Sequence, residues 1–277
     1  MSSADLSPTA RRGLAKAAER APLVSWAELR KYLATHWERG QHVSIFGPTG
    51  AGKTTVLTTL CGAPGHRPVV LVVTKHKDDL IRKLRQRGWK VCSTVDEVER
   101  AVDGGFVERW VRFKNPDEVA AEARVIFWPD TPESIRARRR ELGKSIEDLL
   151  DYCYARGDIT VALDEALYVA EDLKLGASLR ACWHEGRSSG VSLLAASQRP
   201  SWLPKSAYSS PTFLVMFSTN DPDDLKRLGD IGGGLDPRML RRELQLLSEH
   251  EFCFVAPRDR PPWVVRSTIP PPKKNAA

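Results

Sequence analysis

Hydrophobic residues lie in short runs along the chain, and polar or mixed stretches separate these runs. Within runs such as 68–73 and 213–217 the apolar residues are consecutive and do not alternate with polar ones. A strand of this kind is covered on both faces, which is typical of strands inside a parallel sheet. Strands are predicted over residues 42–46, 68–73, 124–128, 159–163, 191–196 and 213–217.

Helical patterns fill the segments between these strands. Ser25 and Glu28 have the spacing of a capping box and predict a helix that starts there and ends near Gly40. Residues 134–157 predict a long basic helix, whereas residues 75–123 show weakly patterned helices and a short βα segment.

The alternation of apolar strands with helical stretches indicates an α/β fold with a mostly parallel central sheet flanked by helices. Two final apolar runs, 251–257 and 263–267, predict a closing hairpin. A chain of 277 residues suits one large domain with a modest appendage. We expect a helical N-terminal extension over residues 1–40, an α/β core over 41–269 and a disordered Pro- and Lys-containing tail over 270–277.

Charge and composition narrow the class of protein only slightly. The net charge of +7 suits a polyanionic partner, although many basic proteins bind none. The five cysteines form no Cys-x-x-Cys pair, so we expect reduced core cysteines and no zinc site. The chain has no apolar stretch that approaches 18 residues, and its first 20 residues lack an apolar signal region. We therefore expect a cytoplasmic protein without a membrane span.

Residues 47–54 match the phosphate-binding pattern G-x-x-x-x-G-K-[ST]. Its glycines allow the backbone to curl, so that N–H groups point at phosphate oxygens beside the start of a helix. Lys53 is expected to reach the β- and γ-phosphates, and the Thr54 hydroxyl to bind Mg²⁺. The residues expected to contact the nucleotide are Gly47, Pro48, Thr49, Gly50, Ala51, Gly52, Lys53, Thr54 and Thr55.

Two acids follow the predicted strand 159–163 directly. At the carboxyl end of a strand beside the P-loop, Asp164 is expected to hold Mg²⁺ through water. Glu165 is expected to act as the general base for the attacking water. In the alternative interpretation, the two acids only cap the next helix.

The segment 186–200, GRSSGVSLLAASQRP, places polar residues at both ends of an apolar strand. This strand is expected to lie next to the strand 159–163, so that Gln198, or Ser197, reaches the γ-phosphate or the attacking water. The alternative for Gln198 is a hydrogen bond to loop backbone. Arg187, in the turn before the strand, is too far for the same nucleotide, but in a ring it could serve a neighbour as an arginine finger. The alternative is an ordinary surface arginine.

Three segments follow one another along the chain: GPTGAGKTT, VALDEA and EGRSSGVSLLAASQRPSWLP. In this order they resemble the FtsK/HerA superfamily of P-loop ATPases, and the resemblance covers roughly residues 41–257. The chain is most similar to the compact genome-packaging ATPases of membrane-containing or tailless viruses. The resemblance implies a RecA-like core, a hexameric ring, ATP with Mg²⁺, and movement of double-stranded DNA through a central channel. It also implies catalytic roles for Lys53, Glu165, Gln198 and Arg187, and Mg²⁺ binding by Thr54 and Asp164. A viral member would act in the host cytoplasm or at a virion vertex, with a capsid or membrane-vertex docking protein as a possible partner.

Two regions are candidates for DNA contact. Arg136, Arg139 and Arg140 lie in the basic helix, which could equally be a solvated charged face. Lys205 follows the predicted strand 191–196 in a loop that, in the resembled family, faces the channel. Contacts to phosphates at these places would not depend on base sequence.

Three function classes therefore remain open. The first is a DNA translocase, for viral packaging or for DNA transfer of the conjugation or segregation type. The second is an ATPase that drives filamentous phage or pilus assembly, or secretion. The third, a nucleotide-dependent switch, is disfavoured by Glu165 and Gln198, since these residue types serve hydrolysis.

Overall fold

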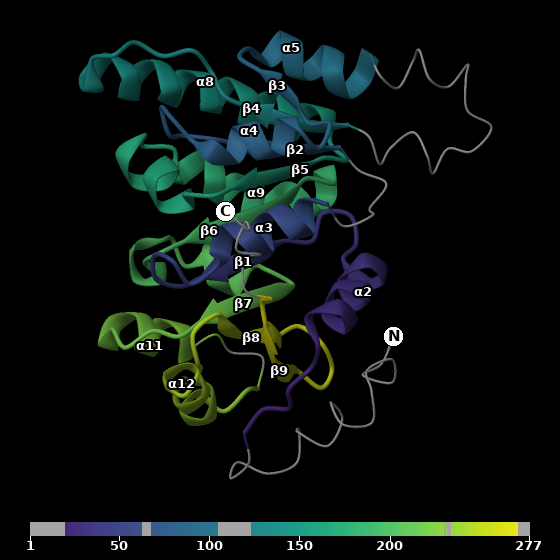
Figure 1. The fold of residues 1–277 in the computed structure, drawn as a ribbon, viewed down its shortest axis with the longest axis vertical. Helices are drawn as coiled ribbons and strands as arrows, with labels where there is room; N and C mark the ends of the chain where they lie inside the picture. Colours follow the sequence, from purple (N-terminus) through teal and green to yellow (C-terminus); the bar gives the residue numbers. More distant parts are fainter. Residues whose placement is uncertain (1–19, 63–67, 105–122, 230, 232–233, 271–277) are drawn as a thin grey trace, which may run out of the picture.

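The computed structural model describes residues 20–62, 68–104, 123–229, 231 and 234–270. They form one nine-stranded sheet in the order β3-β4-β2-β5-β6-β1-β7-β8-β9 (Figure 1). The strands are β1 (Val43–Phe46), β2 (Val69–Val72), β3 (Lys90–Cys92), β4 (Arg124–Phe127), β5 (Thr160–Leu163), β6 (Ser192–Ser197), β7 (Phe213–Phe217), β8 (Glu251–Ala256) and β9 (Trp263–Thr268).

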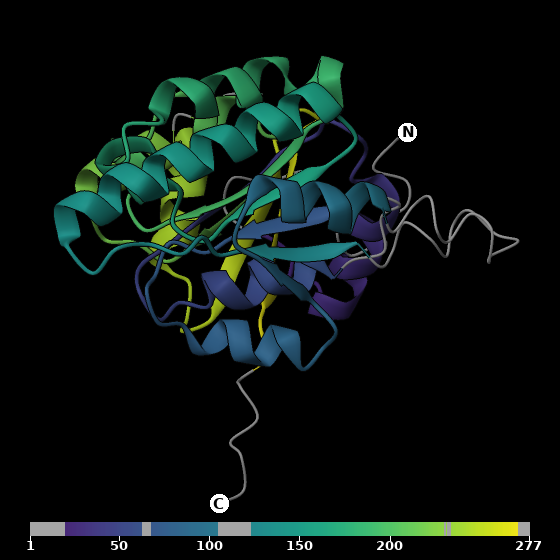
Figure 2. The same cartoon turned by 90° about the horizontal axis from the view of Figure 1, so that it is seen from above.

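Helices cover both faces of the sheet, as Figure 2 shows from above. The α-helices are α2 (Trp26–His36), α3 (Lys53–Cys61), α4 (Asp79–Arg85), α5 (Val95–Glu99), α8 (Ile135–Arg156), α9 (Gly176–Ser189), α10 (Ser206–Ser209), α11 (Pro222–Gly229) and α12 (Pro237–Gln245). Short π-helical segments are η2 (Arg100–Gly104) and η3 (Tyr168–Asp172), and η4 (Pro200–Trp202) is a 3₁₀ turn.

The sheet separates two hydrophobic cores. On one face α5, α8, α9 and α12 bury apolar side chains such as Leu149 and Leu179. On the other face α2, α3 and α4 do so, with Leu33 and Leu57 among the buried residues. Because both faces are covered, β1, β2, β5, β6, β7 and β8 are buried along their whole length. This burial explains why the apolar runs are continuous in the sequence.

The predicted α/β class with a mostly parallel sheet is confirmed. Strands β1 to β7 pair in parallel. The closing hairpin is confirmed as β8 and β9, which are antiparallel to each other, while β8 is also antiparallel to β7. One detail was not expected: β6 lies between β5 and β1, so the strand that bears the acids does not neighbour the P-loop strand.

The described part of the N-terminal extension lies against the core. The capping box of Ser25 and Glu28 is confirmed at the start of α2. The helix ends at His36, earlier than predicted, because Trp37 already has extended backbone. Before the helix, the Val24 N–H donates to the Arg266 carbonyl at 2.8 Å, which ties the segment to β9.

The predicted turn at Gly186 and Arg187 is wrong, because both residues belong to α9. The helix stops at Gly190, whose φ of +82° is left-handed. Gly186 permits a close approach inside the helix: a Cβ there would lie 2.6 Å from the carbonyl oxygen of Val191. The glycine that indicates a turn in the sequence is therefore a packing contact between α9 and the next strand.

All five cysteines are buried and free, which confirms their expected place in the core. Among the described residues, no helix has both the length and the apolar character needed to cross a membrane. The predicted tail 270–277 lies almost wholly outside the described residues, as do residues 1–19 of the extension.

Candidate nucleotide-binding site

The P-loop connects β1 to α3. Gly50 and Gly52 have φ values of +81° and +112°, which residues with a side chain rarely adopt. Gly52 precedes Lys53, the first residue of α3, so that the helix begins directly after the loop. A Cβ on Gly47 would lie 2.6 Å from the Phe217 Cβ, so the loop also passes close to the end of β7. The backbone is thus curled before a helix start, as phosphate binding requires.

Lys53 is buried at the loop, and its Nζ donates to the Pro48 carbonyl at 2.9 Å. Burial lowers the pKa of Lys53, and the charges of Glu165 and Asp164 oppose this effect. The ammonium group therefore lies at the loop backbone and experiences the charges of two acids, and from this position it can neutralise phosphate oxygens.

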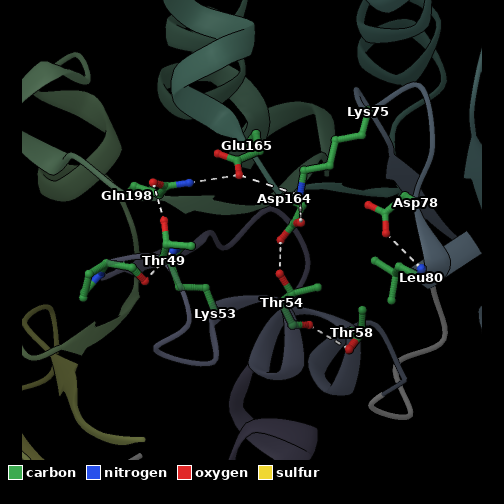
Figure 3. Close-up of polar contacts among 11 residues, drawn as sticks. Thr49, Lys53, Thr54, Thr58, Lys75, Asp78, Leu80, Asp164, Glu165 and Gln198 are labelled. Carbon is green, nitrogen blue, oxygen red and sulfur yellow. Dashed lines mark hydrogen bonds and ion pairs between the residues drawn. The ribbon is translucent and has the colours of Figure 1, made fainter. Parts of the chain in front are cut away.

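Asp164 leaves the end of β5 and accepts a hydrogen bond at 2.8 Å from the Thr54 hydroxyl (Figure 3). Asp164 is buried, with 9% of its surface exposed. The pair brings a hydroxyl and a carboxylate oxygen together beside the phosphate loop. Oxygen ligands of this kind are those that Mg²⁺ prefers, so the residues present fit the expected ion.

Gln198 joins the P-loop to the second acid. The Thr49 hydroxyl donates to Gln198 Oε1 at 2.8 Å, and Gln198 Nε2 donates to Glu165 Oε1 at 3.2 Å (Figure 3). The strand order explains this contact, because β6 pairs with β5 on one side and with β1 on the other. The amide thus contacts side chains of the site. Ser197, its alternative, is buried within the sheet.

Lys75 is a site residue that the sequence analysis missed. Its Nζ lies 3.9 Å from Asp164 Oδ2 and 4.0 Å from Glu165 Oε1, and its side chain is 51% exposed. The Arg138 guanidinium holds the loop after β2 by donating to the Thr74 carbonyl at 2.7 Å. The available signal was the position of Lys75 just after a predicted parallel strand, since the carboxyl ends of such strands share one edge.

Arg187 lies at the opposite end of the sheet from the P-loop, near the end of α9. It lines a cavity there together with Gly40 and His42. The structure therefore does not bring Arg187 to the nucleotide site of its own chain, in agreement with its expected position.

The candidate DNA contacts are surface residues with different surroundings. Arg139 pairs with Asp172, and Arg140 donates to Glu141 at 2.9 Å, so acids already balance part of the basic helix. Arg136 is exposed. Lys205 is exposed at the start of α10 and lines a surface cavity with Trp202, which is 63% exposed.

Comparison with known proteins gives one related sequence and several similar structures. No model of a known protein family matches the chain. The DNA packaging ATPase P9 of Enterobacteria phage PRD1 is 25% identical to it over 185 residues, which span 66% of each protein.

Two solved structures share its fold. The genome packaging NTPase B204 of Sulfolobus turreted icosahedral virus 2, in complex with AMPPCP, covers 83% of this chain and 98% of its own, with a TM-score of 0.56 at 12% identity. VirB4 of Thermoanaerobacter pseudethanolicus covers 84% of this chain and 90% of its own, with a TM-score of 0.54 at 13% identity. These structures show that the chain has the same α/β fold, and the related sequence and the motifs agree with the resemblance to the FtsK/HerA superfamily of P-loop ATPases.

Proposed function

We propose that this chain is the ATP-hydrolysing motor of a viral genome-packaging machine and moves double-stranded DNA. The observation that carries the proposal is the hydrogen-bonded series Thr49–Gln198–Glu165, which links the P-loop to the acid pair through the end of β6. The similar proteins support this proposal, since P9 is a DNA packaging ATPase and B204 is a genome packaging NTPase.

In the proposed reaction, the P-loop N–H groups and Lys53 bind the phosphates of ATP. Thr54 and Asp164 would hold Mg²⁺, which when bound would offset negative charge on the phosphate oxygens. Glu165 accepts a proton from a water molecule, whose oxygen bonds to the γ-phosphorus while the bond to the β-phosphate oxygen breaks. Gln198 donates to Glu165 from one side and contacts the P-loop from the other, so it can orient both the base and the water.

Assembly and cargo complete the proposal. We infer a hexameric ring in which Arg187 of one copy serves the nucleotide of the next, since it lies at the other end of the sheet from its own P-loop. The net charge of +7 suits double-stranded DNA, with Lys205, Arg136, Arg139 and Arg140 as candidate phosphate contacts. The motor core spans 41–269. It would act in the host cytoplasm or at a virion vertex, where a capsid or membrane-vertex protein would dock it.

ATP hydrolysis measured with and without linear double-stranded DNA tests the proposal. We expect stimulation at low salt that weakens as salt is added, because phosphate contacts release counterions. Glu165→Gln protein, carried through the same assay, reports any contaminating activity. A rate that DNA leaves unchanged, together with no salt-dependent DNA binding, would refute the motor function.

A further inference from the structure

A second charged site lies at the amino-terminal end of the parallel strands. There a cavity of about 340 Å³ is lined by both Arg187 and Arg258, together with His42, His184, Thr212 and Asp259. The two arginines are 71 positions apart in sequence, and neither belongs to the nucleotide site described above.

The reversal of the sheet at β8 explains how Arg258 reaches this end. Strand β8 is antiparallel to β7, with Val255 opposite Leu214. The carboxyl end of β8 therefore lies beside the amino ends of β7 and β1, where His42 precedes β1. A parallel β8 would have delivered Arg258 to the P-loop edge.

Neither arginine has an acidic partner among the described residues. Arg258 Nη2 donates to the Ser209 carbonyl at 3.1 Å. The nearby Asp259 carboxylate accepts from the Trp263 indole at 2.5 Å and from the Tyr32 hydroxyl at 3.5 Å. Burial and the positive charge of Arg187 lower the pKa of Arg258. Two like charges share the cavity, so an anion with several oxygens would stabilise both.

The backbone that carries Arg187 is held by close packing. A Cβ on Gly40 would lie 2.6 Å from the Arg187 Cα, so this part of α9 rests directly on the chain before β1. His42 is buried just below it, and its Nδ1 accepts a hydrogen bond at 3.0 Å from the Leu193 N–H. The Arg187 side chain therefore extends from closely packed backbone, and both arginines are exposed to another molecule.

We infer that Arg187 and Arg258 form one site for phosphate oxygens, and that this site receives the nucleotide bound to a neighbouring copy of the chain. In a ring of identical subunits, one surface of each copy meets a different surface of the next. The hydrogen bonds and ion pairs of the acid pair involve Lys75, Thr54 and Gln198, and no arginine among the described residues. Arg258 is thus a second group, besides Arg187, that acts across the interface. The inference rests on the proposed ring-forming ATPase.

The first test replaces Arg258 with Ala and measures ATP hydrolysis by assembled protein without DNA. We expect a fall of at least about 100-fold, which is the size of effect seen when a charge-stabilising donor is removed from a transition state. ATP binding by the subunit should be unchanged, and Arg258→Lys should restore the rate only in part, since lysine lacks the guanidinium fork. Arg260→Ala is the matched control and should hydrolyse ATP normally, because Arg260 is exposed and, within the described part of the chain, hydrogen-bonds only the adjacent Asp259 carbonyl.

The second test mixes Arg258→Ala with Glu165→Gln subunits. The Arg258→Ala subunit keeps its own base and receives an intact Arg258 from its neighbour, so mixed rings should hydrolyse ATP faster than either parent. Absence of recovery at every mixing ratio would overturn the inference. A second result would also overturn it: Arg258→Ala protein that hydrolyses ATP at the normal rate without DNA but shows weaker salt-dependent DNA binding. The cavity would then contact the DNA backbone. Failure of the proposed function itself would appear separately, as unmutated protein that does not hydrolyse ATP.

Discussion

The two ends of the parallel strands differ in how completely their charged groups are paired. At the carboxyl end, Gln198 bonds both Thr49 and Glu165, and Asp164 bonds Thr54. At the amino end, Arg187 and Arg258 lie in one cavity with no acid bound to either among the described residues. The carboxyl end has the groups expected of a nucleotide site, whereas the two arginines of the amino end have no acidic partner among the described residues. This difference supports the proposal that one copy binds the nucleotide and that a second copy completes the reaction.

The largest expected effect comes from removing Glu165, the proposed base, at the carboxyl end of the parallel strands. We call this end, where the charged groups are paired, the paired end. Glu165→Gln should lower turnover about 1,000-fold, because an amide does not accept a proton from water. ATP binding should persist, since the P-loop contacts remain. Steady-state hydrolysis and nucleotide titration measure the two effects, with exposed Glu171→Gln as the control. Normal hydrolysis by Glu165→Gln would mean that another group is the base.

His42 supports the amino end and predicts a dependence of stability on pH. Burial, with a smaller contribution from the Arg258 charge, lowers the pKa of His42 to about 4, below its ordinary value of 6.5. Between these values the unfolded chain binds a proton that the folded protein excludes, so stability falls as pH decreases. The contribution is fully present above about pH 6.5, and about 3 kcal/mol is lost by pH 4.

Chemical denaturation of His42→Gln against unmutated protein checks this value. The variant should lose less stability than the unmutated protein as the pH falls from 6.5 to 4, whereas the exposed-site control His184→Gln should keep the original slope. Identical slopes for all three proteins would show that His42 is not held neutral.

Gln198 tests whether the paired end works as one unit. Gln198→Ala removes the contact between the P-loop and Glu165, and we expect turnover to fall about 30-fold through loss of orientation. The Michaelis constant should change little, because the P-loop itself is intact. Hydrolysis kinetics of this variant are compared with those of exposed Gln245→Ala. A change in the Michaelis constant alone would assign Gln198 to nucleotide binding.

The smallest effect is expected at Lys75, which is half exposed beside the acid pair. Lys75→Ala should reduce turnover about tenfold, because water screens an exposed charge more than a buried one. Lys77→Ala removes an exposed lysine two positions away and serves as the control. Equal rates for the two variants would exclude a role for Lys75 in the reaction.

The paired end could be predicted from the sequence because its signals are local. The P-loop pattern, the acids after an apolar strand and Gln198 at the end of another strand each belong to one short segment. Parallel strands then deliver these segments to a common edge, as observed. Lys75 was missed because a single lysine after a strand has no pattern of its own.

The amino end could not be predicted in the same way, since it depends on contacts that are distant in sequence. Arg258 reaches this end because β8 is antiparallel to β7 and therefore runs in the opposite direction to the parallel strands before it. The sequence predicts a turn at Arg187 because Gly186 and Gly190 flank it, although only Gly190 ends the helix. Gly186 reflects the packing of α9 on Val191, and no local pattern reports such packing.

The central claim is that the protein moves along double-stranded DNA. Displacement of a third strand from duplex DNA tests this claim most directly, because a motor that moves along the duplex removes the third strand. Protein and ATP are added to linear DNA that carries a bound triplex-forming oligonucleotide, and release of that oligonucleotide is followed in time. The motor function predicts release that requires ATP and disappears with Glu165→Gln. An oligonucleotide that stays bound while DNA-stimulated ATP hydrolysis proceeds would contradict it.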